Sequence, residues 1–295
     1  GVTSSWIYHH FSLANAQDGD PSDLPSLLRR LAVEVEDRSI DTEDILDVTI
    51  SSEVARASGL TESDLGDLER GHAPRRKEQV RAVAHALGLR PEPLEQVVEG
   101  WTPSGVPAAV PHVETVLGSI GGYEVKGYIV HDRGEAVMID TAYDPKGMMR
   151  VLAEKGLRLR AICLTHGHSD HAEGIEDLLH STRVPVYLGP GDLDLLGWRP
   201  PAELLSTPQD GGTVTVGGLT ITFLTTPGHT PGGICYRVDQ ADRPLCFVGD
   251  TLFAGSIGRS NPAGLYATHL ESVRRRVLKL SHETCLFPGH GPATT

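Results

Sequence analysis

Three histidines and one aspartate lie within six consecutive residues of this 295-residue chain. They are His166, His168, Asp170 and His171, in the segment Thr165–His171. Imidazole nitrogen suits zinc and iron, and carboxylate oxygen suits harder cations, so the set favours a divalent transition metal. A lone histidine is more often a core or surface polar residue, but four metal-ligand types on one short turn are hard to explain in that way. The segment therefore predicts a metal site.

Three more residues of the same kinds stand beside glycines further along the chain. They are His229 in the sequence PGHTPGG, Asp250 in GDTLF and His290 in PGHGP. Each follows or adjoins a predicted strand, where a rigid scaffold can direct side chains toward a common point. Glycine lets the backbone pack closely around a metal. Asp140 follows an earlier strand, and we expect it to orient the ligand loop rather than to bind metal.

The elements that must position these residues alternate between strands and helices from about residue 111. Apolar runs bounded by glycine or charge predict strands at 125–130, 136–139, 161–164, 184–188, 213–216, 219–224, 234–238 and 245–248. Pro145 begins a predicted helix that ends near Lys155, and an amphipathic helix is predicted over 266–280. Strands with intervening helices predict a layered α/β sandwich.

Taken in order, these motifs resemble the metallo-β-lactamase superfamily over residues 111–295. The resemblance implies an αββα sandwich with its site at one edge and a centre for two divalent metal ions, zinc foremost, with iron and manganese as alternatives. A water held between two such cations becomes a nucleophilic hydroxide near neutral pH. The resemblance assigns His166, His168 and His229 to the first metal, Asp170, His171 and His290 to the second, Asp250 to both, and a catalytic part to Asp170 and Asp250.

The sequences GDTLFAGSIGRSN and PGHTPGGICY look most like glyoxalase II (hydroxyacylglutathione hydrolase) and the short thioesterases related to it. This resemblance implies hydrolysis of the thioester of a small thiol carrier, with Arg259 holding the carrier's carboxylate. Secreted β-lactamases lack the aspartate found here at Asp250, and RNA-processing members need a basic surface. Glyoxalase II itself carries a C-terminal helical domain that supplies much of the glutathione site; we expect this protein to lack that domain and to use a different thiol carrier or a broader range of thioesters.

Two other functions stay open from the sequence. The first is a persulfide dioxygenase, which shares much of the motif set but binds a single iron through His166, His229 and Asp250, or else a lactonase-like hydrolase. The second is a ligand-sensing regulator that uses the N-terminal helices and is not an enzyme. Retention of all seven candidate ligands favours catalysis over sensing. Iron content with oxygen consumption would identify the dioxygenase, and DNA binding would identify the regulator.

The N-terminal part differs from the rest in charge and in its predicted elements, and we divide the chain into residues 1–52, 53–105 and 106–295. Residues 1–52 hold ten acidic and three basic residues, with a helix predicted between 22 and 35. Their sequence predicts no particular function. Residues 53–105 predict short helices and a linker, and VARASGLTESDLGDLERG resembles Cro/repressor helix-turn-helix domains. The helix that would enter DNA is acidic, so phosphates would repel it. A packing module or a homodimer contact is favoured over nucleic-acid binding.

The composition excludes several classes of protein. The net charge is −13 and no stretch is strongly basic, which argues against nucleic-acid partners. No apolar run reaches 18 residues, so we expect no membrane span, and no secretory signal is visible. The four cysteines form no Cys-x-x-Cys pair and suggest no disulfide framework. The expectation is a cytoplasmic enzyme acting on a small molecule.

Overall fold

The computed structural model describes residues 52, 54–69, 77–86, 90–99, 101–107, 109–121, 123–239, 243–260 and 262–295. The chain forms two compact units, Gly1–Thr102 with Gly255–Arg259, and Pro103–Ala254 with Ser260–Thr295. The helix predicted between residues 22 and 35 lies outside the described residues. Among the described residues, no helix is both long enough and apolar enough to cross a membrane.

The described residues between 52 and 99 are mostly helical, as the sequence predicts for residues 53–105. Residues 54–58 form a helical turn, and the longer helices are α4 (Glu62–Glu69), α5 (Lys77–Ala86) and α6 (Pro91–Val98). A capping box begins α4: the Thr61 hydroxyl accepts the Asp64 N–H at 3.1 Å, and the Asp64 carboxylate accepts the Thr61 N–H at 3.2 Å. A small apolar cluster that includes Leu65 and Val83 packs the helices together.

The second unit contains two sheets. The first has the strand order β1–β2–β3–β4–β5–β6, with β1 (Val113–Ile120), β2 (Tyr123–Asp132), β3 (Glu135–Ile139), β4 (Arg158–Cys163), β5 (Val186–Tyr187) and β6 (Leu205–Ser206). The second has the order β11–β10–β9–β8–β7, with β7 (Thr213–Val216), β8 (Leu219–Thr225), β9 (Ile234–Val238), β10 (Leu245–Gly249) and β11 (Cys285–Pro288). The predicted strands are present, and β1, β6 and β11 are additional to them.

Alternation along the central strands divides their side chains between two cores. On β2, Ile129 faces one core, whereas Tyr128 and Val130 face the other. On β4, Ile162 and Cys163 separate in the same way, as the two-residue period of a strand requires. One core lies between the two sheets, and the other lies between the first sheet and its helices. The first sheet is thus buried on both faces, which accounts for its continuous apolar runs.

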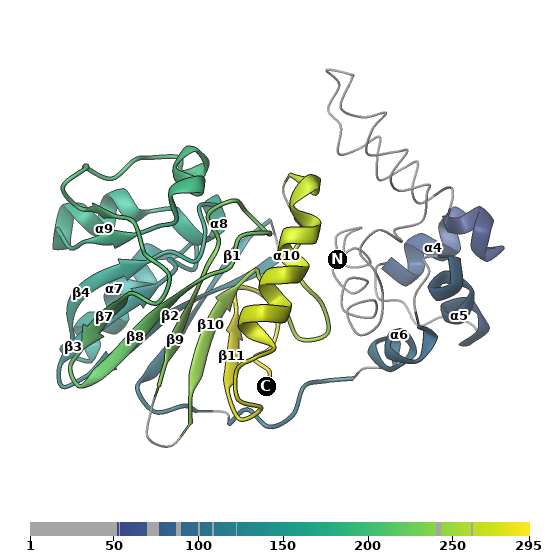
Figure 1. Cartoon of the computed structure of the whole chain (residues 1–295), viewed down its shortest axis with the longest axis horizontal. Helices are drawn as coiled ribbons and strands as arrows, with labels where there is room; N and C mark the ends of the chain where they lie inside the picture. The colour runs from purple at the N-terminus through teal and green to yellow at the C-terminus, as the bar shows by residue number, and fades with distance from the viewer. Residues whose placement is uncertain are drawn as a thin grey trace. The chain divides into compact units, whose positions relative to one another are not determined.

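Helices cover the sandwich on both sides (Figure 1). On the first sheet lie α7 (Pro145–Glu154) and α9 (Ile175–Thr182), with the short α8 (Ser169–Ala172) and the 3₁₀ turn η2 (Pro190–Leu195) between strands. Beside the second sheet runs α10 (Tyr266–Ser272), preceded by the turn η3 (Ala263–Leu265) and continued by the π-helical turn η4 (Val273–Val277). The layers form the predicted αββα sandwich.

Strand direction determines where the chemically interesting loops lie. Strands β3 and β4 are parallel, as are β10 and β11. Both β8 and β10 are antiparallel to β9, so β8 runs in the same direction as β10. The two sheets are joined at this end by the Ile234 N–H, which donates to the Thr165 carbonyl at 2.9 Å, and by the Tyr128 hydroxyl, which donates to the Pro288 carbonyl at 2.6 Å. The carboxyl ends of these strands therefore meet at one edge.

Candidate metal centre

Five strands end at this edge, and the residue types with metal-binding chemistry follow them. Asp140 follows β3, the segment 165–171 follows β4, His229 follows β8, Asp250 follows β10 and His290 follows β11. The side chains form three overlapping groups whose ligand atoms lie within 4.8 Å of one another, namely His166–His168–His229, His166–Asp170–His171 and His171–Asp250–His290. All seven predicted ligands thus lie in one cluster.

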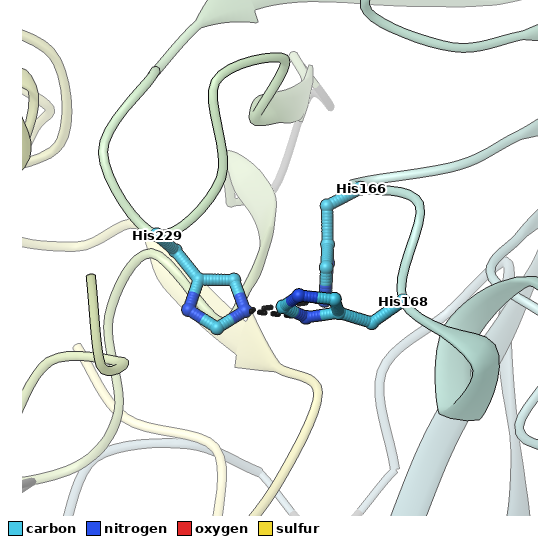
Figure 2. A group of neighbouring side chains, drawn as sticks. All are labelled: His166, His168 and His229. Carbon is cyan, nitrogen blue, oxygen red and sulfur yellow. Dashed lines mark hydrogen bonds between the residues drawn. The ribbon is translucent and has the colours of Figure 1, made fainter. Parts of the chain in front are cut away.

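The first part of the cluster consists of imidazoles only, and we call His166, His168 and His229 the imidazole half. The Nε2 atom of His229 lies 3.3 Å from Nε2 of His166 and 3.0 Å from Nδ1 of His168. Figure 2 shows the three rings converging from two loops onto one point. Two nitrogens bound to a tetrahedral zinc would lie about 3.3 Å apart. The spacing is that of three ligands around a single cation.

The second part, which we call the mixed half, combines Asp170, His171 and His290. The Oδ2 atom of Asp170 lies 3.2 Å from Nε2 of His290 and 3.6 Å from Nε2 of His171. His171 is fully buried, whereas the side chains of Asp170 and His290 retain 23% and 28% exposure. Of the two halves, the mixed half therefore carries the negative charge, and part of it faces solvent.

Asp250 lies between the two halves. Its Oδ1 atom is 3.3 Å from Nε2 of His171, and its Oδ2 atom is 3.5 Å from Nε2 of His290 and 3.7 Å from Nε2 of His229. One carboxylate therefore reaches a nitrogen of each half. This is the arrangement needed for a residue that binds two cations at once.

Asp140 sets the orientation of the segment after β4, as the sequence predicts. Its Oδ1 atom accepts the Thr165 N–H at 2.7 Å, and its Oδ2 atom accepts both the Thr165 hydroxyl at 2.7 Å and Nδ1–H of His171 at 2.9 Å. In its neutral form His171 then carries its proton on Nδ1, which leaves the lone pair on Nε2 for a metal. The Thr165 oxygen, having donated to Asp140, accepts Nδ1–H of His166 at 3.1 Å. Both rings therefore present Nε2 to the cluster.

A backbone carbonyl orients the ring of His290 in the same way. Nδ1 of His290 lies 2.7 Å from the Glu124 carbonyl oxygen, which can only accept, so Nδ1 carries the proton and Nε2 faces the carboxylates. Lys126 holds the same loop, through its N–H to the Gly289 carbonyl at 2.8 Å and its ammonium to the Gly291 carbonyl. The amino end of β2 thus supports the C-terminal ligand.

The electrostatics of the cluster favour bound positive charge. Burial alone would raise the pKa of Asp250, but the imidazoles of His290 and His171 hold that pKa well below its usual range, so the carboxylate is ionised at neutral pH. Burial lowers the pKa of His166 and keeps its ring neutral. Burial would also lower the pKa of His171, yet the carboxylates of Asp250 and Asp140 raise it well above its usual value. The site therefore attracts positive charge to Nε2 of His171.

Two unsatisfied atoms test whether these residues fit a metal. Nε2 of His171 and Oδ1 of Asp250 are buried and have no hydrogen-bond partner among the residues that the structure describes. Gly289 packs against the same two side chains, since a Cβ there would lie 2.3 Å from Cε1 of His171 and 2.5 Å from Oδ1 of Asp250. Unpaired buried polar atoms are costly, and a cation would satisfy both. The donor set and its geometry fit a divalent metal.

Arg259, the predicted substrate-binding residue, is exposed. It belongs to the segment Gly255–Arg259, which groups with the first unit. Its contact with a substrate stays a prediction.

Two buried polar residues near the cluster were not singled out from the sequence. Asp192 on η2 accepts hydrogen bonds from the loops that carry His166 and His229. His269 on α10 lies with Nε2 2.9 Å from the Thr251 carbonyl, next to Asp250. Each contacts loops that are distant in sequence, and neither stands in a motif that predicts such contacts.

Comparison with known proteins agrees with this geometry. The sequence model of the "Metallo-beta-lactamase superfamily" matches residues 120–290, more than half of the chain. The probable metallo-hydrolase YqgX of Bacillus subtilis is 31% identical over 189 residues, 59% of this chain and 89% of the relative. A hydroxyacylglutathione hydrolase of Hahella chejuensis is 39% identical over 166 residues, 55% of this chain and 59% of that protein.

A solved structure gives the same result for the fold. The B3 metallo-beta-lactamase BLEG-1 superposes with a TM-score of 0.54 and 28% identity, covering 62% of this chain and 94% of that one. The family match begins at residue 120, so it gives no support to the helix-turn-helix resemblance of the N-terminal helices.

Proposed function

The chain belongs to the metallo-beta-lactamase superfamily, and from that premise we propose that it is a two-metal hydrolase that cleaves the thioester of a small thiol carrier. The position of Asp250 carries this proposal. Its two oxygens approach nitrogens of both halves of the cluster, at 3.3 Å from His171 and 3.7 Å from His229. A site for one metal has no need of the second set of ligands.

The residues of the chain have distinct proposed roles. The imidazole half and the mixed half would each hold one divalent ion, and Asp250 would be a ligand to both. Two ions held in this way would supply a nucleophile from water near neutral pH and stabilise negative charge on the substrate oxygen. Asp140 keeps Nε2 of His171 free to bind, through its contact with Nδ1. Asp170 is more exposed than Asp250, 23% against 9% for the side chain, and so is the carboxylate we assign to proton exchange with the substrate.

The thioester part of the proposal depends on sequence similarity. The GDTLF and PGHTPGG motifs look like those of glyoxalase II, and the Hahella chejuensis relative is named a hydroxyacylglutathione hydrolase. Arg259 is the basic residue that we assign to the carboxylate of the carrier. Replacing Arg259 with alanine should raise KM for a carboxylate-bearing thioester more than it lowers kcat. An unchanged KM would leave Arg259 without a role in substrate binding.

The decisive experiment is an assay of thiol release from S-lactoylglutathione. The full chain is reconstituted separately with zinc, manganese and iron, and Asp250→Asn is assayed beside it. Asp132→Asn is the matched control, because Asp132 accepts the Gly218 N–H at 2.7 Å, at the far end of the strands from the cluster. Thiol release by the parent and the control, with loss in Asp250→Asn, is the expected result.

Absence of thiol from a fully metallated protein would overturn the thioesterase proposal. Oxygen uptake on glutathione persulfide by the iron form would then identify a dioxygenase that uses His166, His229 and Asp250. Hydrolysis of a lactone without thioester cleavage would identify the lactonase-like alternative.

A further inference from the structure

Asp192 is a carboxylate with no accessible surface that lies outside the seven candidate ligands. It stands on η2, the turn that follows β5 in the first sheet. Among the residues that the structure describes, it takes part in no ion pair. The oxygens of this buried carboxylate instead accept hydrogen bonds, and the donors come from two loops of the metal cluster.

The contacts of Asp192 join the two loops of the imidazole half. Its Oδ2 atom accepts the Gly167 N–H at 3.1 Å, from the residue between His166 and His168. The same oxygen accepts the Thr230 hydroxyl at 2.6 Å, and Oδ1 accepts the Gly232 N–H at 2.6 Å, both from the loop of His229. A single carboxylate thus connects the loop after β4 to the loop after β8.

Backbone packing leaves little freedom around these contacts. A Cβ on Gly189 would lie 1.9 Å from the Gly232 carbonyl oxygen, and one on Gly191 would lie 2.9 Å from Cβ of Pro231. A Cβ on Gly167 would lie 2.6 Å from the Asp192 carbonyl oxygen. The turn therefore packs directly against both loops, and a shift of Asp192 would be transmitted to them.

We propose that Asp192 is a positioning residue that fixes the distance between the His166–His168 pair and His229, and thereby sets the metal affinity of the imidazole half. This inference rests on the proposed two-metal site. The hydrogen-bond partners of Asp192 include no residue of the mixed half, whose rings are oriented instead by Asp140 and the Glu124 carbonyl. Loss of Asp192 should therefore weaken one metal site and leave the other nearly unchanged.

The chemistry of the carboxylate explains why asparagine cannot replace it. All three partners donate, and an ionised aspartate only accepts. In asparagine one oxygen becomes an NH₂ group, which faces the N–H of either Gly232 or Gly167. The Thr230 hydroxyl can reverse its direction, but a backbone N–H cannot. One buried donor stays unsatisfied in either orientation, without any change in side-chain size.

The test is a titration of the metal-free full chain with Zn²⁺ and, separately, with Co²⁺, comparing the parent, Asp192→Asn and Asp132→Asn. We expect the parent and the control to bind two ions tightly. In Asp192→Asn one ion should bind about 10- to 100-fold more weakly, as for other residues that orient metal ligands. The Co²⁺ absorption spectrum should change for that ion alone, which a general loss of stability would not produce.

A second variant covers the case in which Asp192→Asn does not fold, as judged by circular dichroism. Thr230→Val removes one of the three hydrogen bonds to Asp192, and the imidazole half should then bind its metal about 5-fold more weakly. Two ions bound with parental affinity and spectrum in either folded variant would overturn the role of Asp192. A parent that binds fewer than two ions would instead overturn the two-metal proposal itself.

Discussion

The two halves of the cluster differ in the chemical types of their ligands and in the residues that orient those ligands. The imidazole half has three imidazole nitrogens as ligands, and its loops are joined through their backbone by Asp192. The mixed half carries carboxylates, and its rings are oriented one by one, His171 by Asp140 and His290 by the Glu124 carbonyl. One half is therefore organised by the spacing of its loops and the other by the direction of its rings. The same fold uses two methods to build adjacent metal sites.

The largest effect should come from the residue that the halves share. Asp250→Asn removes a negative charge that faces both His171 and His229, so both ions should be lost, together with at least about 100-fold in rate. Metal content by plasma mass spectrometry and folding by circular dichroism are the measurements. A folded variant with two ions and parental activity would show that the halves are independent of Asp250.

The next effect should separate the halves. Asp140→Asn keeps the size of the side chain but turns an NH₂ group toward the Thr165 N–H or toward both the Thr165 hydroxyl and Nδ1–H of His171. The mixed half should bind its metal about 10- to 100-fold more weakly, measured by competition with a chromophoric chelator. The imidazole half should lose less, because Asp140 reaches His166 only through Thr165.

Asp144→Asn is the matched control for that measurement. Asp144 accepts the Gly147 N–H at 2.9 Å as the N-cap of α7, and asparagine is an equally good cap. Equal weakening of both metal sites in Asp140→Asn would contradict the division of labour between the halves.

A smaller effect should appear in the choice of metal. Imidazole favours zinc, whereas carboxylate oxygen is better suited to manganese. Manganese added to the metal-free chain should fill the mixed half first, at about tenfold lower concentration than the imidazole half. A tenfold difference in affinity requires a difference in binding free energy of only about 1.4 kcal/mol. Electron paramagnetic resonance follows the filling. Simultaneous filling at equal concentrations would remove the chemical distinction between the halves.

The smallest effect concerns a carboxylate outside the cluster. Burial would raise the pKa of Asp210, but the Thr225 N–H, the Thr225 hydroxyl and Arg276 lower it below its usual value. Its contribution to stability is present above the unfolded pKa of about 3.9 and is lost as the pH falls through the lower, folded pKa. Asp210→Asn should cost at most about 1 kcal/mol at pH 7, since the pair is exposed.

The measurement for Asp210 is urea unfolding at several pH values. The difference between parent and variant should shrink below pH 4 and vanish at lower pH. A difference that stays constant with pH would show that Asp210 contributes through packing rather than charge.

The sequence could predict much of this fold because the signals are local. Apolar runs located the central strands, and Pro145 marked the start of α7. Strand β1 was missed because polar residues such as Glu114 and Thr115, together with Gly118, interrupt its apolar run. Strand β6 has only two residues, too few for a pattern, and β11 ends at Pro288, a residue that is uncommon in strands. The N-terminal helix-turn-helix resemblance found no support, since short helices with tight turns occur in many small helical units.

The residues of the candidate site likewise include some that the sequence predicts and some that it misses. His166, His168, Asp170 and His171 were visible because one turn holds them all. The residues that orient the ligands were harder to find: Asp140 was expected to orient the ligand loop, but Asp192 was missed, because its partner Gly232 lies 40 residues away. An aspartate in a glycine- and proline-rich segment predicts an exposed turn. Only the tertiary structure shows that Asp192 is buried against the loops that donate hydrogen bonds to it.

The sequence by itself determined the kinds of ligand and their order, because imidazole and carboxylate chemistry belongs to the side chains and the motifs are contiguous. The tertiary structure decided which atoms meet. It turned Nε2 of His171 inward through Asp140, set Asp250 between the two halves, and placed a buried carboxylate behind the imidazole loops. Hydrogen bonds act over about 3 Å, so these relations exist only once parallel strands from two sheets end at one edge.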